Sequence, residues 1–366
     1  MTDLSTLKRV VIGRPRASRE LKHQLLPKWM ALPVFSSDPL SSVAYATEEM
    51  MLVLILAGAG AFNMVMPLAF AVASLLAIVV ISYRQTVRAY PQGGGAYRVS
   101  RENLGELPGL TAAAALLIDY SLTVSVSIAA GVAAIVSAAP AVGSYRLELA
   151  LLFVALVTIA NLRGVKEAGA LFAFPTYTFV ATMFALIITG IVKCAVGGCP
   201  SAPVTEVIRP ETGITLFLVL RAFSSGSTAL TGVEAISDGV QAFRYPQSRN
   251  AATTLAVMGA LAVTMFLGIS FLATHIENIR PFEDMGPTVN AQIALAVFGD
   301  GLGFIMVMVV TAAILVLAAN TAYADFPRLS SILAGDRYLP ANWSRSVTGW
   351  RSATGSCPLR CWPACC

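Results

Sequence analysis

Acidic side chains inside apolar stretches are the residues of this sequence best suited to chemistry. Asp119 lies in the apolar run 112–130, and Thr123 and Ser127 follow it by four and eight residues, so one face of a helix would carry all three. Carboxylate and hydroxyl oxygens are hard donors that suit an alkali cation stripped of part of its water. The pattern therefore predicts a cation site or a proton relay.

Two further carboxylates lie in apolar stretches. Asp38 directly precedes Pro39, and Glu234 lies three residues after Thr231, a spacing that would place both side chains on one side of a helix. A carboxyl group whose protonation changes could couple proton movement to cation movement. The other interpretation stays open, in which one or more of these acids are protonated and serve only as structural hydrogen-bond partners.

The composition indicates the class of protein that positions these side chains. Of 366 residues, 56% are hydrophobic and 12% are charged, whereas soluble domains carry about 25% charged residues. This balance excludes a water-soluble enzyme, a disordered chain and a nucleic-acid reader. The net charge of +5 is typical of Lys and Arg in cytoplasmic loops. We expect an all-α, multi-pass membrane protein.

Eight segments are apolar and long enough to cross a bilayer, which takes about 20 residues. The fourth is short and its ends are poorly defined. Together they form an expected transport domain over residues 31–334. The segments lie near residues 31–58, 64–83, 108–139, 147–161, 171–193, 214–240, 251–273 and 301–324.

Positive charges predict the orientation. Of the 25 Lys and Arg residues, 20 fall in the first 30 residues or in the loops on that same side of the membrane. Because Lys and Arg mark the cytoplasmic side, an even number of spans places both termini in the cytoplasm. Residues 1–30 are polar and basic, which indicates a cytoplasmic tail and no signal peptide.

Spans one and six share a motif that predicts an internal repeat. Residues 35–43 read FSSDPLSSV and residues 223–233 read FSSGSTALTGV. Pro39 removes a backbone donor, and Gly226 and Gly232 favour irregular backbone, so both helices are expected to break there. Paired broken helices point to the central site of a transporter. Close packing of small residues is the alternative explanation.

At this point the sequence resembles a known family. Residues 90–97, YPQGGGAY, look like a cytoplasmic signature of the amino acid–polyamine–organocation superfamily, and within it the chain is most similar to the KimA-like (YdaO-like) bacterial potassium importers. The resemblance implies a LeuT-like fold of five-plus-five inverted repeats, here ending after about eight spans. The matching stretches are residues 35–49, 82–105, 116–123, 231–238 and 318–340.

The resemblance also implies a function. These importers are secondary active transporters thought to run as potassium–proton symporters in the bacterial inner membrane, with no cofactor and no metal besides the transported potassium. The proton would be carried by Asp119, Asp38 or Glu234. Partners would be potassium, protons and the bilayer, with a homodimer left open and nucleic acid excluded. By resemblance, potassium would be held by Asp38, Tyr45, Asp119, Tyr120, Thr123, Thr231 and Glu234.

Two alternatives remain at this point. Amino acid permeases of the same superfamily cradle the substrate's carboxylate at the break in span one, where Asp38 would repel it. A permease for cationic or neutral amino acids is therefore the second hypothesis. The third is a non-transporting remnant that only occupies the membrane. An enzyme is not expected, because no nucleophile–base set is visible.

Other motifs suggest supporting roles. The glycines at 93–95 lack the Lys that a phosphate-binding loop requires, which favours a cytoplasmic hinge. Cys194 and Cys199 could pair, or the glycines between them could form a plain turn. Asn320 and Tyr323 are expected to reach the central site. Asp325 and Arg328 are expected to form an ion pair outside the ion site.

Residues 335–366 do not continue the pattern. The resemblance is expected to stop near residues 340–344, and the Cys-, Trp- and Arg-rich stretch that follows has no helical period. A shifted reading frame would explain this aberrant tail. Under that hypothesis spans six to eight would lack the last two helices of their repeat.

Overall fold

The computed structural model describes residues 25–163, 169–202, 213–282, 286–340 and 343, and it is helical throughout. Two isolated single-residue bridges are the β-structure seen in these ranges. The all-α prediction is confirmed. The α-helices are α2 (Lys28–Leu54), α3 (Val65–Ala89), α4 (Gly95–Leu104), α5 (Glu106–Ala138), α6 (Arg146–Arg163), α7 (Gly169–Gly197), α8 (Leu216–Gly226), α9 (Ala235–Asp238), α10 (Gln247–His275), α11 (Val289–Phe298) and α12 (Leu302–Gly335).

Eight helical segments within the described residues are long and apolar enough to cross a membrane, as expected. The short fourth span gains length from a 3₁₀ segment, Pro140–Tyr145, ahead of α6. α11 was not expected, because its ten residues fall short of the length that a span requires. The bounds of the eight are Lys28–Ala57, Gly60–Ala89, Glu106–Ala138, Pro140–Asn161, Phe172–Gly197, Leu216–Asp238, Gln247–His275 and Leu302–Gly335.

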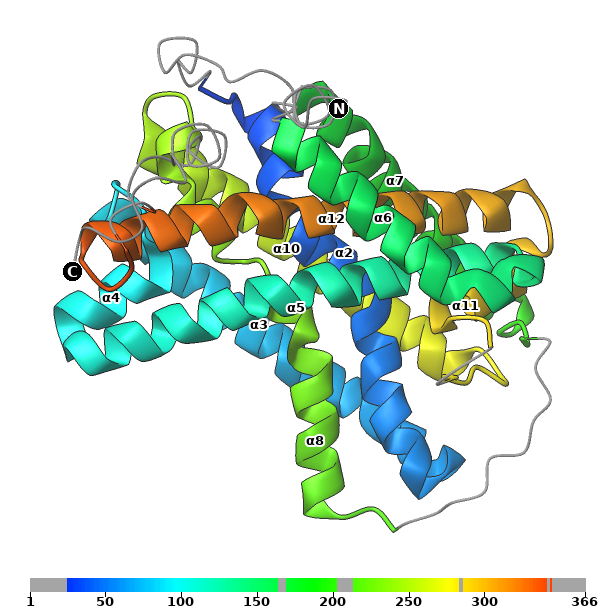
Figure 1. Cartoon of the computed structure of the whole chain (residues 1–366). Coiled ribbons are helices and arrows are strands. Elements are labelled where there is room, and N and C mark those ends of the chain that lie inside the picture. The colour runs from blue at the N-terminus through cyan, green and yellow to red at the C-terminus, as the bar shows by residue number, and fades with distance from the viewer. Residues whose placement is uncertain (1–24, 164–168, 203–212, 283–285, 341–342, 344–366) are drawn as a thin grey trace, which may run out of the picture.

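α2 occupies the centre of the molecule. It packs against α7, α8, α10 and α12, and nearly all of its residues from Ala31 to Thr47 are buried. α5 and α12 run side by side across the molecule (Figure 1). α8 lies at the edge, where Leu216 and Phe217 are exposed to the surroundings. Small residues in α2 allow this close packing on all sides.

The expected break in span one is not observed. α2 continues as one α-helix through Pro33 and Pro39. The hydroxyl groups of Ser41 and Ser42 donate to the carbonyl oxygen of Asp38 at 2.9 and 3.0 Å. Prolines are tolerated in membrane helices where neighbouring helices and hydroxyl side chains support the backbone. Because α2 packs against four other helices, it stays helical at the site that was expected to unwind.

The expected break in span six is confirmed. α8 ends at Gly226, and a 3₁₀ turn, Ser227–Leu230, follows it. Thr231 is extended and Gly232 adopts a φ of +76°, after which α9 begins. Glycine takes this left-handed conformation without the steric cost that a side chain would add. The span is therefore a helix, an irregular stretch and a short second helix.

α10 lies in close contact with α3 and α7. A Cβ atom placed on Gly259 of α10 would lie 2.8 Å from Val80 of α3, and one on Gly268 would lie 2.7 Å from Ile187 of α7. Small residues let membrane helices approach this closely. α3, α7 and α10 therefore form a tightly packed unit beside α2.

The segment before α2 pairs with the chain that follows span six. The backbone N–H of Leu26 donates to the carbonyl of Ala242 at 2.7 Å, and the N–H of Arg244 donates to the carbonyl of Leu26 at 3.1 Å. The rings of Phe35 and Phe243 stack with centroids 5.4 Å apart. These contacts join the start of the first repeat to the second.

The end of α12 is held to α4 and α5 by polar contacts. Asp336 pairs with Arg101 and accepts a 2.8 Å hydrogen bond from the hydroxyl of Tyr97. Burial acts to raise the pKa of Asp336, but the hydrogen bonds from Arg101 and Tyr97 outweigh it and hold the pKa below its ordinary value. The hydroxyl of Tyr338 donates to Glu106 at 2.6 Å. This polar cluster fixes the starting end of α5.

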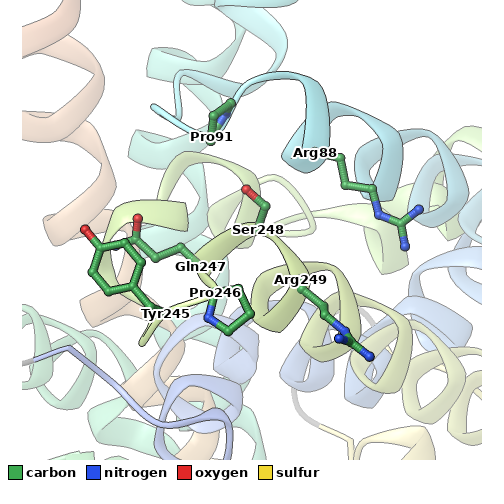
Figure 2. A pocket seen from close by; sticks show the side chains of 7 residues that line it. All are labelled: Arg88, Pro91, Tyr245, Pro246, Gln247, Ser248 and Arg249. Atoms are coloured by element: carbon green, nitrogen blue, oxygen red, sulfur yellow. The ribbon is translucent and has the colours of Figure 1, made fainter.

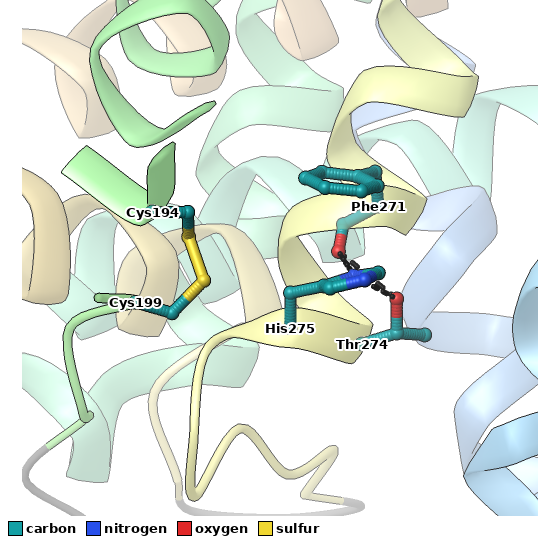
Figure 3. The surroundings of a disulfide bond; sticks show 5 residues. All are labelled: Cys194, Cys199, Phe271, Thr274 and His275. Carbon is teal, nitrogen blue, oxygen red and sulfur yellow. Dashed lines mark hydrogen bonds between the residues drawn. A yellow bond between two sulfur atoms is a disulfide. The ribbon is translucent and has the colours of Figure 1, made fainter. Parts of the chain in front are cut away.

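A disulfide closes a short loop at the far end of α7, near the far end of α10. Cys194 and Cys199 are bonded, which settles the open choice between a pair and a plain turn (Figure 3). The N–H of Ala202 donates to the carbonyl of Glu277 at 2.9 Å and so joins the segments that follow the two helices. His275 ends α10 and stacks on Phe271.

Candidate functional site

A hydroxyl network joins α2 to the broken part of span six. Ser42 Oγ lies 2.8 Å from Thr231 Oγ1, 3.2 Å from Tyr45 Oη and 3.5 Å from Asp38 Oδ1. Three expected site residues, Asp38, Tyr45 and Thr231, therefore meet around one serine. Ser42 was not among the candidates, although its spacing of four residues from Asp38 on a helix was a signal for it.

The carboxyl group of Asp38 rests directly against the irregular backbone of span six. A Cβ atom placed on Gly232 would lie 2.7 Å from Asp38 Cγ and 2.8 Å from Pro39 Cδ. Any residue but glycine would clash here as well as strain the backbone. The two segments of the sequence repeat thus meet at one point, with a buried carboxyl group between them.

Glu234 lies just beyond this point. It is buried, and its Oε1 has no hydrogen-bond partner within the described residues. It interacts electrostatically with Asp119, Asp38 and Asp238. The helical-face argument that paired it with Thr231 is wrong, because Thr231 is extended and the helix restarts only after Glu234. Thr231 bonds to Ser42, whereas Glu234 is influenced electrostatically by the other acids.

α5 supplies the third side of the site. Asp119 is half-buried and interacts with both Asp38 and Glu234, while Thr123 and Ser127 are buried further along the helix. The hydroxyl of Tyr120 donates to Asp238 Oδ2 at 3.2 Å. Within the described residues, Thr123 makes no hydrogen bond to the other candidates.

The cluster contains two acids that the sequence interpretation left out. Asp238 lies one turn after Glu234, and Asp325 is buried on α12. Asp325 forms the expected ion pair with Arg328, but it also interacts with Asp38 and Asp238. Its carboxylate is thus close enough to influence the cluster, and its expected place outside the ion site stays a prediction. The four-residue spacing from Glu234 was an available signal for Asp238, whereas the sequence offered none for Asp325.

The glycine loop packs against the end of this cluster. Gly93, Gly94 and Gly95 all have positive φ angles. A Cβ atom on Gly93 would lie 2.7 Å from the Asp238 carbonyl oxygen, and one on Gly95 would lie 3.1 Å from Asp238 Cγ. Because only glycine allows this approach, the loop closes over Asp238. Its role as a hinge stays a prediction.

Two residues of α12 point elsewhere than expected. Asn320 accepts a 2.6 Å hydrogen bond from Asn161, and the hydroxyl of Tyr323 lies 2.6 Å from that of Thr158. Both partners lie on α6, so these side chains fasten α12 to α6 and do not reach toward α2. The contact of α12 with α2 comes instead from Thr321, whose hydroxyl lies 2.9 Å from that of Ser37.

The arrangement combines excess negative charge with hydroxyl oxygens. Five acids interact with one another, and Arg328 opposes them at the end near Asp325 and Asp238. No three His, Cys, Asp or Glu side chains in the described ranges gather closely enough to hold a metal ion. Such a site suits a weakly held monovalent cation with mixed hydroxyl and carboxylate ligands. The acids of the cluster are Asp38, Asp119, Glu234, Asp238 and Asp325.

Comparisons with known proteins agree with this description. Eight spans, one of them broken beside a buried carboxyl group, define a multi-pass membrane protein of the transporter class. The family model described as "Amino acid permease" matches residues 38–361, and the chain belongs to this family. The family supports the LeuT-like fold and a protein that is not an enzyme. The match runs beyond residues 340–344, where the resemblance was expected to stop.

One relative is similar to this chain over most of its length. The chain is 48% identical over 336 residues to "Potassium transporter KimA" of Bacillus subtilis (strain 168). The alignment covers 92% of this chain and 55% of that protein. The chain thus spans about half the length of the relative that it matches.

Proposed function

We propose that this chain is the transport part of a potassium importer that works as a potassium–proton symporter. The observation that carries the proposal is the carboxyl group of Asp38, buried against Gly232 at the break in span six. When it is ionised, this carboxylate attracts a cation into the centre of the molecule. The potassium transporter named above supports the choice of ion.

Potassium would bind between α2, span six and α5. The Ser42 network brings oxygen atoms of Asp38, Tyr45 and Thr231 together, while Glu234 and Asp119 supply negative charge from the two other elements. Tyr120 and Thr123 would line the α5 side. Hydroxyl and carboxylate oxygens would replace part of the ion's hydration shell, and conduction requires that the ion is held weakly enough to depart.

Proton coupling would follow from the excess of acids. Asp38, Asp119 and Glu234 repel one another when all are ionised. Potassium alone neutralises one negative charge, and a proton on a neighbouring acid neutralises a second. Movement of the loaded site across the membrane then costs less than movement of a half-loaded one, which is an electrostatic basis for symport. Any of the three acids can carry the proton.

The test is rubidium uptake by the purified chain in liposomes with an imposed proton gradient. We expect uptake that rises with the gradient and is lost in Asp38→Asn, Asp119→Asn and Glu234→Gln. Asp300→Asn is the control, because Asp300 is an exposed acid outside the site. Normal uptake in both Asp119→Asn and Glu234→Gln would overturn the assignment of the site.

Exchange measurements locate the proton carrier. An amide at the proton-carrying position holds that site permanently neutral. Such a variant should still exchange internal potassium for external rubidium, yet it should no longer accumulate rubidium in response to the gradient. Loss of both activities indicates an ion ligand. If all three amides lose accumulation and exchange together, symport through these acids is wrong.

An amino acid permease is the second candidate, because the matching family bears that name. In this superfamily the substrate's carboxylate approaches the break between spans one and six, where Asp38 would repel it. Competition by a mixture of cationic and neutral amino acids distinguishes the two. Inhibition of rubidium uptake, or uptake of a labelled amino acid, would favour the permease. Insertion of the chain without uptake of either would favour a non-transporting remnant.

We further propose that both termini face the cytoplasm of a bacterial inner membrane. The Arg-rich loops beside α4 and α10 lie on one side of the spans, and the Cys194–Cys199 disulfide lies at the other end of α7. Disulfides persist in oxidising compartments outside the cytoplasm. After reduction, a membrane-impermeant thiol reagent should label Cys199 in intact cells. Labelling only after cell lysis would reverse the orientation.

A further inference from the structure

A hollow of about 620 Å³ lies where the end of α3 meets the start of α10 (Figure 2). Arg88 comes from the last turn of α3, and Gln247, Ser248 and Arg249 form the first turn of α10. No acidic residue of the described chain lines the hollow. Both guanidinium groups are exposed and extend to the same side of it (Figure 2).

Backbone and amide groups give the hollow a fixed shape. Gln247 Nε2 donates to the carbonyl oxygen of Gln241 at 2.8 Å, and Gln241 Nε2 donates to that of Gln92 at 3.0 Å. These bonds join the start of α10 to the loop after α3. Pro246 precedes the 29-residue helix and offers no side-chain cap, so the first N–H groups of α10 add partial positive charge to that of the arginines.

Arg88 ends an apolar strip on the outward face of α3. Ile81, which is 54% exposed, lies seven residues before Arg88 and so on the same face of the helix. The Gly259–Val80 contact holds α3 against α10 beside this face. An apolar helix face therefore leads along the span to a positively charged hollow.

We propose that this hollow binds the headgroup of an anionic phospholipid, with an acyl chain along the outward face of α3. The phosphate would pair with Arg88 and Arg249, because arginine binds phosphate oxygens in a bidentate way. Ser248 and Tyr245 also line the hollow. Anionic lipids are attracted to basic groups at this membrane surface, and the apolar face of α3 explains why a lipid fits better than a free phosphate.

The test uses the purified full chain in a neutral detergent and follows thermal unfolding as lipid is added. Dioctanoyl phosphatidylglycerol should raise the unfolding midpoint in a saturable way, since a ligand that binds the folded state stabilises it. Dioctanoyl phosphatidylcholine and inorganic phosphate should not do so at the same concentrations. An equal effect of phosphatidylcholine, or of phosphate alone, would overturn the assignment to an anionic lipid.

Variants connect the effect to the hollow. In Arg88→Gln/Arg249→Gln we expect apparent affinity for phosphatidylglycerol to fall about tenfold, and in each single variant by less. Lys28→Gln removes an exposed charge at the start of α2, outside the hollow, and should leave the affinity unchanged. Because all three side chains are exposed, folding should be preserved. Unchanged affinity in the double variant would show that the lipid binds elsewhere, and the result is independent of rubidium uptake.

Discussion

Residues 35–43 and 223–233 have similar sequences but different backbone conformations. The first stays in one α-helix through Pro39, while the second leaves the helix at Gly226 and turns at Gly232. The first lies in the centre of the molecule and its carbonyl at Asp38 is bonded by two hydroxyl groups. The second begins in an edge helix and contains a glycine at positive φ. Surroundings and glycine geometry, more than proline, decide which repeat breaks.

The two segments depend on each other at the contact between Asp38 and Gly232. The continuous helix presents the Asp38 carboxyl group, and the broken one brings the bare backbone of Gly232 against it. Neither a second break nor a second continuous helix would give this contact. Asymmetry within an internal repeat can therefore create a site that neither half forms alone.

Gly232→Ala should have the largest effect, because it disrupts the contact between the two segments. The new methyl group would collide with Asp38 and Pro39, and the left-handed backbone alone costs about 1–2 kcal/mol for alanine. We expect rubidium uptake to fall at least about tenfold and the unfolding midpoint to drop by several degrees.

Gly226→Ala is the matched control. Gly226 has a helical φ of −64°, and its nearest neighbour would be the flexible end of Met50 at 3.2 Å. This variant should keep uptake within about twofold of the parent, because alanine favours helix. Equal behaviour of the two variants would show that the close contact at Gly232 has no functional role.

Ser42→Ala tests the network between the two segments. The substitution removes the hydroxyl group shared by Thr231, Tyr45 and Asp38. A hydrogen bond contributes about 1 kcal/mol, so we expect the KM for rubidium to rise about fivefold. Ser41→Ala provides the comparison, since among the described residues the Ser41 hydroxyl bonds within its own helix, to the carbonyl of Asp38. A similar rise in both variants would contradict a specific role for the network.

Asp336→Asn tests a polar contact that lies outside both segments. The pKa of Asp336 is lower in the folded protein than its ordinary value of 3.8, so ionised Asp336 stabilises the fold. That stabilisation is complete above the ordinary value and is lost as pH falls through the lower, folded-state pKa. We expect the variant to unfold at a lower temperature at neutral pH and the difference to vanish in acid. If the difference in unfolding temperature grew in acid, ionised Asp336 would not be the form that stabilises the fold.

Pro39→Ala should have the smallest effect. Because α2 is already helical at this position, restoring a backbone N–H should change uptake by less than about twofold and stability by about 1 kcal/mol or less. Pro33→Ala, at the other proline inside α2, is the control. Loss of uptake in Pro39→Ala alone would show that the working protein does break span one there.

Much of the fold could be predicted because long apolar helices carry a strong signal. The eight spans follow from hydropathy, and the break in span six follows from its glycines. The helix α11 was not predicted, because a run of only ten residues does not distinguish a short helix from a loop. The continuity of α2 was missed because a proline is visible in the sequence, whereas the hydroxyl groups that support the backbone act only in context.

The site could be predicted in part. Carboxylates within spans are conspicuous, and Asp38, Asp119 and Glu234 do interact. Asp325 was assigned only to its pair with Arg328, because spacing shows partners on one helix and not contacts between helices. The same reason explains the wrong orientation given to Asn320 and Tyr323, whose partners lie on α6.

The pairing of Leu26 with Ala242 and Arg244 imposes an order on biosynthesis. The ribosome adds about 5–20 residues per second, and Leu26 finds its partners only when the chain is roughly 220 residues longer. The first span must therefore wait on the order of 10–40 seconds in the membrane before its amino end is fastened. During that interval the insertion machinery, rather than the finished fold, has to shield the carboxyl group of Asp38 from lipid.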